Sequence, residues 1–115
     1  MRDLEITEQR GSEGTLVRLR GRLDIDSSPA FRDRLQIALE ESPKTVTIDL
    51  AQVSYLDVSG IATLIEGLKI ARSRNSGLCL QGLQGRIAHL FQATGVLPLF
   101  QGPGCADASS ELKVS

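Results

Sequence analysis

The sequence predicts a single α/β domain in which a mixed sheet of four to five strands packs with three to four helices. Two observations indicate this class. Apolar residues alternate near the start of the chain, as they do in strands, and from residue 45 onward strand patterns alternate with helical ones. Strands that are joined through helices run parallel in one sheet. Because 115 residues support one hydrophobic core, we expect one domain over residues 1–101.

The first predicted elements are a hairpin and a helix. Apolar residues alternate on both sides of a Gly-Ser-Glu-Gly turn at residues 11–14, which predicts two antiparallel strands. A Ser-Ser-Pro sequence at residues 27–29 signals a helix start, since a serine oxygen can accept early N–H groups and proline fits the first turn. The helix is expected over residues 29–41. Its predicted buried face consists of Phe31, Leu35, Ala38 and Leu39.

The second half of the chain predicts two more strands and two more helices. A strand over residues 45–50 leads through a polar turn into a helix over residues 58–74, and a short buried strand covers residues 78–80. A third helix is expected to end at Gly95. Residues 96–100 are expected to add an edge strand, where proline is tolerated. The buried face of the second helix is predicted to consist of Ile61, Leu64, Ile65, Leu68 and Ala71.

Composition disfavours several classes of function. Thirteen Lys and Arg stand against 14 Asp and Glu, and only 3% of residues are aromatic, so nucleic acid is not an expected partner. No apolar run approaches the roughly 20 residues that cross a bilayer, which predicts a cytoplasmic protein without direct membrane insertion. Cys79 and Cys105 form no CxxC pair, and we expect neither a metal nor a cofactor. Residues 102–115 form a polar tail, either without regular structure or with a short helix over residues 106–112.

The segment Asp57-Val58-Ser59-Gly60 places a serine hydroxyl at the predicted start of the second helix. Backbone N–H groups and the positive end of the helix dipole meet there, so a phosphate on Ser59 is expected to be held by groups that are otherwise open. Gly60, without a side chain, is expected to leave the hydroxyl approachable. A structural explanation also stays open, because Asp and Ser are favoured helix caps worth about 1 kcal/mol.

Two carboxylates before the first helix and the single histidine complete the set of candidates. Asp24 and Asp26 are expected near the Ser59 loop, either as part of a docking surface or as turn residues. A metal or acid–base cluster of these two with Asp57 is disfavoured, because no histidine or lysine recurs at ligand spacing beside them. His89 is expected on the surface, and no catalytic residue is predicted.

With this layout, the chain resembles the STAS domain family, which includes the anti-sigma factor antagonists. In that family the serine or threonine before the glycine of the loop is phosphorylated by a partner serine kinase that is also the anti-sigma factor, and by position this residue is Ser59. Many members carry a further hydroxyl where this chain has Val58, so Ser59 is the sole candidate in the loop. The resemblance covers about residues 4–101 and rests on Gly21-Arg22-Leu23-Asp24, on Ile48-Asp49-Leu50 through Leu56 to Gly60, and on Leu90 to Val96.

The resemblance implies a regulatory binding protein and not an enzyme. The unphosphorylated chain would bind an anti-sigma factor serine kinase, phosphorylation of Ser59 would end the interaction, and a phosphatase would reset it. An alternative is an accessory subunit that docks on the ATPase of a lipid-transport ABC system, with the Ser59 loop as a structural contact. A third is a small-molecule-binding or enzymatic domain with a deep pocket. The implied partner-binding residues are Asp24, Asp57, Val58, Ser59, Gly60 and Ile61.

Overall fold

The computed structural model describes residues 3–12 and 14–100. Its single mixed sheet has the strand order β1-β2-β3-β4, with β1 antiparallel to β2 and with β2, β3 and β4 parallel. The predicted α/β class is confirmed, whereas the predicted tail over residues 102–115 lies outside the described residues. The elements are β1 (Leu4–Gly11), β2 (Gly14–Leu23), α1 (Ser28–Glu40), β3 (Thr45–Leu56), α2 (Val58–Ser73), β4 (Gly77–Gln81), α3 (Gly85–Thr94) and the 3-10 helix η1 (Leu97–Phe100).

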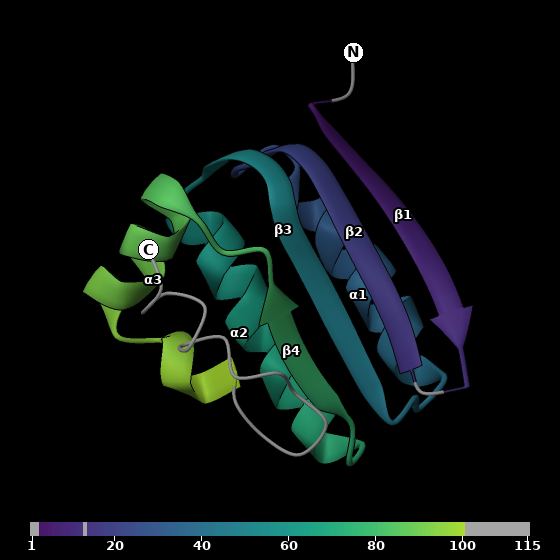
Figure 1. Cartoon of the computed structure of the whole chain (residues 1–115). Helices are drawn as coiled ribbons and strands as arrows, with labels where there is room; N and C mark the ends of the chain where they lie inside the picture. Colours follow the sequence, from purple (N-terminus) through teal and green to yellow (C-terminus); the bar gives the residue numbers. More distant parts are fainter. Residues whose placement is uncertain (1–2, 13, 101–115) are drawn as a thin grey trace.

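The core lies between the sheet and the two helices that cover one of its faces. Figure 1 shows α1 and α2 packed side by side behind the sheet, while α3 and η1 lie at the β4 side. The predicted helix faces are buried, except that Ile65 is only partly buried, which confirms the helical periodicity. The buried residues on the covered face of the strands include Val17, Leu19, Val46, Ile48, Leu78 and Leu80.

The start of α1 follows the predicted signature only in part. Pro29 lies in the first turn, as expected. The Ser27 side chain, however, caps no helix N–H group. Its hydroxyl accepts from the Asp24 N–H at 3.0 Å and donates to the Arg22 carbonyl at 2.8 Å. Ser27 therefore stabilises the loop after β2, and the predicted capping role is wrong.

Strand β3 is longer than predicted, because it continues through the expected polar turn to Leu56. Val53 and Leu56 are buried, and β3 remains paired with β2 as far as the Leu23 and Leu56 pair, after two register shifts. Asp57 alone separates the strand from α2. The Ser59 segment is thus attached directly to a central strand and is not carried on a separate loop.

The predicted edge strand at residues 96–100 is wrong, because Leu97–Phe100 forms the 3-10 helix η1. Pro98 has no N–H group for a strand ladder. Leu97 and Phe100, three residues apart, are both buried, and the Phe100 ring packs edge-to-face on Phe91 with 6.2 Å between centroids. A helical turn brings both side chains to the core, which a strand could not do at this spacing.

Candidate functional site

The candidate site lies at the end of the sheet where β2 and β3 finish and α1 and α2 begin. The Asp57 N–H group donates to the Leu23 carbonyl at 3.4 Å, which joins the two strand ends. The Ser28 and Ser59 Oγ atoms are 3.4 Å apart, which joins the two helix starts. Ser28 also donates to the Asp24 carbonyl at 2.7 Å. The structure thus brings the Asp24 loop beside Ser59.

Asp57 is the cap of α2. One oxygen, Oδ1, accepts from the Ser59 N–H at 3.0 Å, from the Gly60 N–H at 3.3 Å and from the Ser59 hydroxyl. The N–H groups that the sequence suggested were open to a phosphate are therefore already paired with a carboxylate. The expectation that these N–H groups are open is wrong, because the Asp57 carboxylate already accepts from them. A phosphate on Ser59 would stand beside a negative charge.

Ser59 is partly buried and lies in the first turn of α2. Its hydroxyl donates to Asp57. Ser28 is 3% exposed, and its hydroxyl donates to the Asp24 carbonyl, which is closer to it than the Ser59 hydroxyl is. Thr63 donates to the Ser59 carbonyl at 2.9 Å. Ser59 is therefore held firmly at the rim of the core and is not sealed inside it.

Asp24 organises the loop between β2 and α1. Its Oδ1 accepts from the Asp26 N–H at 3.0 Å and from the Ser27 N–H at 3.1 Å, and its Oδ2 lies 3.5 Å from Arg22 Nε. Burial raises the pKa of Asp24, but the hydrogen bonds from Ser27 and Asp26 and the charge of Arg22 outweigh that effect. The pKa of Asp24 is therefore lowered. The sequence left two roles open for Asp24, in a docking surface or in a turn, and these hydrogen bonds support the turn role.

Gly60 and Ile61 lie beneath the surface of the site. A Cβ atom on Gly60 would come within 2.6 Å of Leu56 Cδ1 and 2.9 Å of Leu23 Cγ. The glycine is needed because α2 approaches the strand ends closely, so the expectation that it keeps the hydroxyl approachable is wrong. Ile61 is 5% exposed and belongs to the core.

Three large side chains that precede or begin the two helices are exposed. Val58 is 74% exposed, Ile25 is 72% exposed and Tyr55 is 41% exposed. The Arg22 guanidinium lies 4.2 Å from the centre of the Tyr55 ring. Ile25 and Tyr55 were not predicted from the sequence to belong to this site. A signal existed, because Ile25 stands between two aspartates directly before a helix start, where a polar residue is usual.

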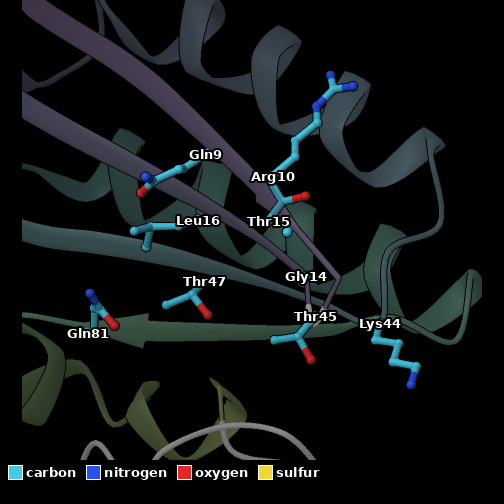
Figure 2. Close-up of a pocket in the computed structure, with 10 residues that line it drawn as sticks. Gln9, Arg10, Gly14, Thr15, Leu16, Lys44, Thr45, Thr47 and Gln81 are labelled. Atoms are coloured by element: carbon cyan, nitrogen blue, oxygen red, sulfur yellow. The ribbon is translucent and has the colours of Figure 1, made fainter.

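A broad groove of about 760 Å³ lies at the opposite end of the sheet (Figure 2). Figure 2 shows Gln9, Leu16, Thr47 and Gln81, one from each strand. The ten residues that line the groove include no histidine, cysteine or carboxylate. The lining residues are Gln9, Arg10, Gly11, Gly14, Thr15, Leu16, Lys44, Thr45, Thr47 and Gln81.

The remaining candidates from the sequence are a metal cluster of aspartates, one histidine and two cysteines. In that part of the chain no group of three or more His, Cys, Asp or Glu side chains could hold a metal ion. His89 is exposed, as expected, and Cys79 is buried, whereas Cys105 lies outside the described residues. None of the helices described is both long enough and apolar enough to span a membrane.

Comparison with known proteins identifies relatives over most of the chain. A family model described as "Mlab, STAS domain" matches residues 6–99. The chain is 30% identical over 98 residues to the anti-sigma-B factor antagonist of Listeria monocytogenes, covering 85% of each chain. It is 27% identical over 94 residues to the Bacillus subtilis protein of the same name, covering 82% of this chain and 85% of that protein.

Solved structures show the same fold at lower sequence identity. An anti-sigma factor antagonist from Mycobacterium paratuberculosis superposes with a TM-score of 0.74 at 18% identity, covering 96% of this chain and 92% of that chain. The unphosphorylated form of the anti-sigma factor antagonist SpoIIAA gives a TM-score of 0.73 at 17% identity, covering 96% and 95%. At these identities the two structures support the fold alone.

Proposed function

The chain belongs to the STAS domain family, and we propose that it is an anti-sigma factor antagonist whose partner binding is switched by phosphorylation of Ser59. The relatives named as antagonists, which align over most of their length, support the class of function. The observation that carries the switch is the position of Ser59. Its hydroxyl lies at the start of α2, partly exposed, beside the exposed side chain of Val58.

The switch acts through charge at an interface. The unmodified hydroxyl is neutral and gives its hydrogen to Asp57. A phosphate at this position adds about 1.5 to 2 negative charges, removes that hydrogen bond and stands beside the Asp57 carboxylate. A partner surface that fits the neutral hydroxyl would have to desolvate the phosphate without a matching cation. A loss of about 3 kcal/mol weakens a micromolar complex more than a hundredfold.

The proposed partner is an anti-sigma factor serine kinase, and a phosphatase returns Ser59 to the hydroxyl form. Val58 and Asp24 supply partner-facing surface, and Asp57 holds the hydroxyl in place. Gly60 and Ile61, which are buried, support the surface from beneath. In this proposal the protein binds and is modified in the cytoplasm but catalyses no reaction.

Affinity for the kinase tests the switch. A pull-down from the native host, followed by identification of the bound protein, is expected to recover an ATPase of the GHKL kinase type. Ser59→Ala should bind that kinase as tightly as the unmodified protein, and Ser59→Asp should bind at least about tenfold more weakly, because its carboxylate adds charge at the interface. Calorimetric titration measures both. Equal affinities for the two variants would overturn the proposal.

The hydrogen bond between Ser59 and Asp57 also favours a second candidate, in which the loop is a purely structural contact. The accessory-subunit function on a lipid-transport ABC ATPase needs no kinase and no phosphate. The same pull-down separates the two, since recovery of a transporter ATPase in place of a kinase supports the second candidate.

A further inference from the structure

Exposed apolar side chains are concentrated at one end of the molecule. Within residues 3–12 and 14–100, the exposed large hydrophobic residues are Ile25, Ile37, Tyr55, Val58 and Leu99. Single exposed residues are normal on a soluble protein, whereas a group of them marks an interaction surface. Ile25, Tyr55 and Val58 belong to one end of the sheet, because β2 and β3 pair there through Leu23 and Leu56.

Regular structure and hydrogen bonds hold the backbone at these three residues. Tyr55 is covered on one ring face by Arg22, which also lies 3.5 Å from the Asp24 carboxylate. Ile25 is held in a loop whose next two N–H groups both donate to Asp24. Val58 is the first residue of α2, directly after the Asp57 cap. A backbone that is already ordered loses little conformational entropy on binding, which favours affinity.

The surface beside Ile25 is acidic, whereas Tyr55 is covered by the Arg22 guanidinium. A groove of about 530 Å³ between β1 and α1 begins in the same loop as Ile25, and its floor includes Leu4 and Ile6. Its lining carries three aspartates, Asp3, Asp26 and Asp33, and none of them makes an ion pair with a described residue. The one cation in the lining, Arg34, lies 3.7 Å from Glu8.

We propose that Ile25, Tyr55 and Val58 form the docking patch for the kinase, and that the kinase meets it with an apolar hollow flanked by Lys or Arg side chains. This inference rests on the proposed function and adds Ile25 and Tyr55 to its interface. The apolar residues supply the area that is removed from water, and the aspartates beside them match the cations. Val58 directly precedes Ser59 in α2, so a phosphate on Ser59 would stand next to the patch.

Charge substitutions in the patch test the proposal, with the kinase recovered by the pull-down as the probe. Ile25→Asp and Val58→Asp should each weaken binding by about tenfold or more, because each places a carboxylate in an apolar contact. Both positions are highly exposed, so both variants are expected to fold. Val58 also begins α2, where an aspartate is favourable. Circular dichroism checks this point.

Ile37→Asp is the matched control. Ile37 is 50% exposed but lies in the second half of α1, away from the strand ends, so its substitution should leave the affinity unchanged. The affinity of the original protein should fall as salt is raised, because the proposed contacts are charged at the rim.

The outcomes separate this inference from the proposed function. Weak binding by the two patch variants and normal binding by the control support the docking patch. If Ser59→Asp weakens binding but Ile25→Asp and Val58→Asp do not, the patch is overturned and the switch stands. If the chain recovers no kinase, both fail.

Discussion

The two helices that cover the sheet begin side by side, yet their first turns are built differently. At α2 the Asp57 carboxylate caps the helix, whereas at α1 the Ser27 side chain caps no helix N–H group. At α1 a proline removes one donor, and backbone carbonyls of the preceding loop accept from Ser28 and Phe31. At α2 the Asp57 carboxylate accepts from the first N–H groups, so the Ser59 hydroxyl is not needed as the cap and is left as a candidate for modification.

The largest expected effect comes from the close approach of α2 to the strand ends. Gly60→Ala should lower the free energy of unfolding by about 1–3 kcal/mol, because the added Cβ overlaps Leu56 and Leu23. Urea denaturation monitored by circular dichroism measures the change. Ala62→Ser, at an exposed site in the same helix, serves as the control and should change stability little. An unchanged midpoint for Gly60→Ala would show that the α2 start is not tightly packed.

Removal of the acid cap tests the difference between the two helix starts. Asp57→Ala should lower the free energy of unfolding by about 1 kcal/mol, whereas Asp57→Asn should keep most of the stability, because asparagine is also a good cap. Ser27→Ala should not unwind the first turn of α1, since its hydroxyl bonds only to the preceding loop. Amide hydrogen exchange at the two first turns measures this. If Ser27→Ala lost as much protection in the first turn of α1 as Asp57→Ala lost in the first turn of α2, the two helix starts would not differ as described.

The smallest expected effect concerns the pH dependence from Asp24. Its pKa is lowered in the folded protein from an ordinary value of 3.8, so its contribution to stability is present above pH 3.8 and is lost as pH falls through the folded value. Asp24→Asn should remove this part of the acid sensitivity. Urea midpoints at neutral and acidic pH for both proteins provide the comparison. An identical pH dependence would mean that Asp24 is not stabilised by its loop.

Local patterns predicted much of the fold, and the differences have identifiable physical causes. The face of α1 with Phe31 and Leu35 and the end of α3 at Gly95 follow from helical spacing and from a left-handed glycine. The length of β3 depends on pairing with β2, which no local window contains. At residues 97–100, the burial of Leu97 and Phe100 overrides the strand preference of the apolar run.

The sequence pointed to the residues of the candidate site but not to the hydrogen bonds between them. The motif identified Ser59 and Asp57, yet the carboxylate occupies the N–H groups that were expected to be open. Both residues are acceptable caps in isolation, and only the geometry of the turn decides which one caps. Tyr55 and Ile25 were missed, because their exposure depends on the end of the sheet where β2 and β3 meet the helices.

Intact-mass analysis of the protein purified from its native host tests the central claim most directly. The account predicts a fraction that is heavier by one phosphate, which maps to Ser59 by fragmentation and is absent from Ser59→Ala. The kinase should co-purify only with the lighter fraction. A protein that carries no phosphate on Ser59 under any condition in which the kinase is released would contradict the account.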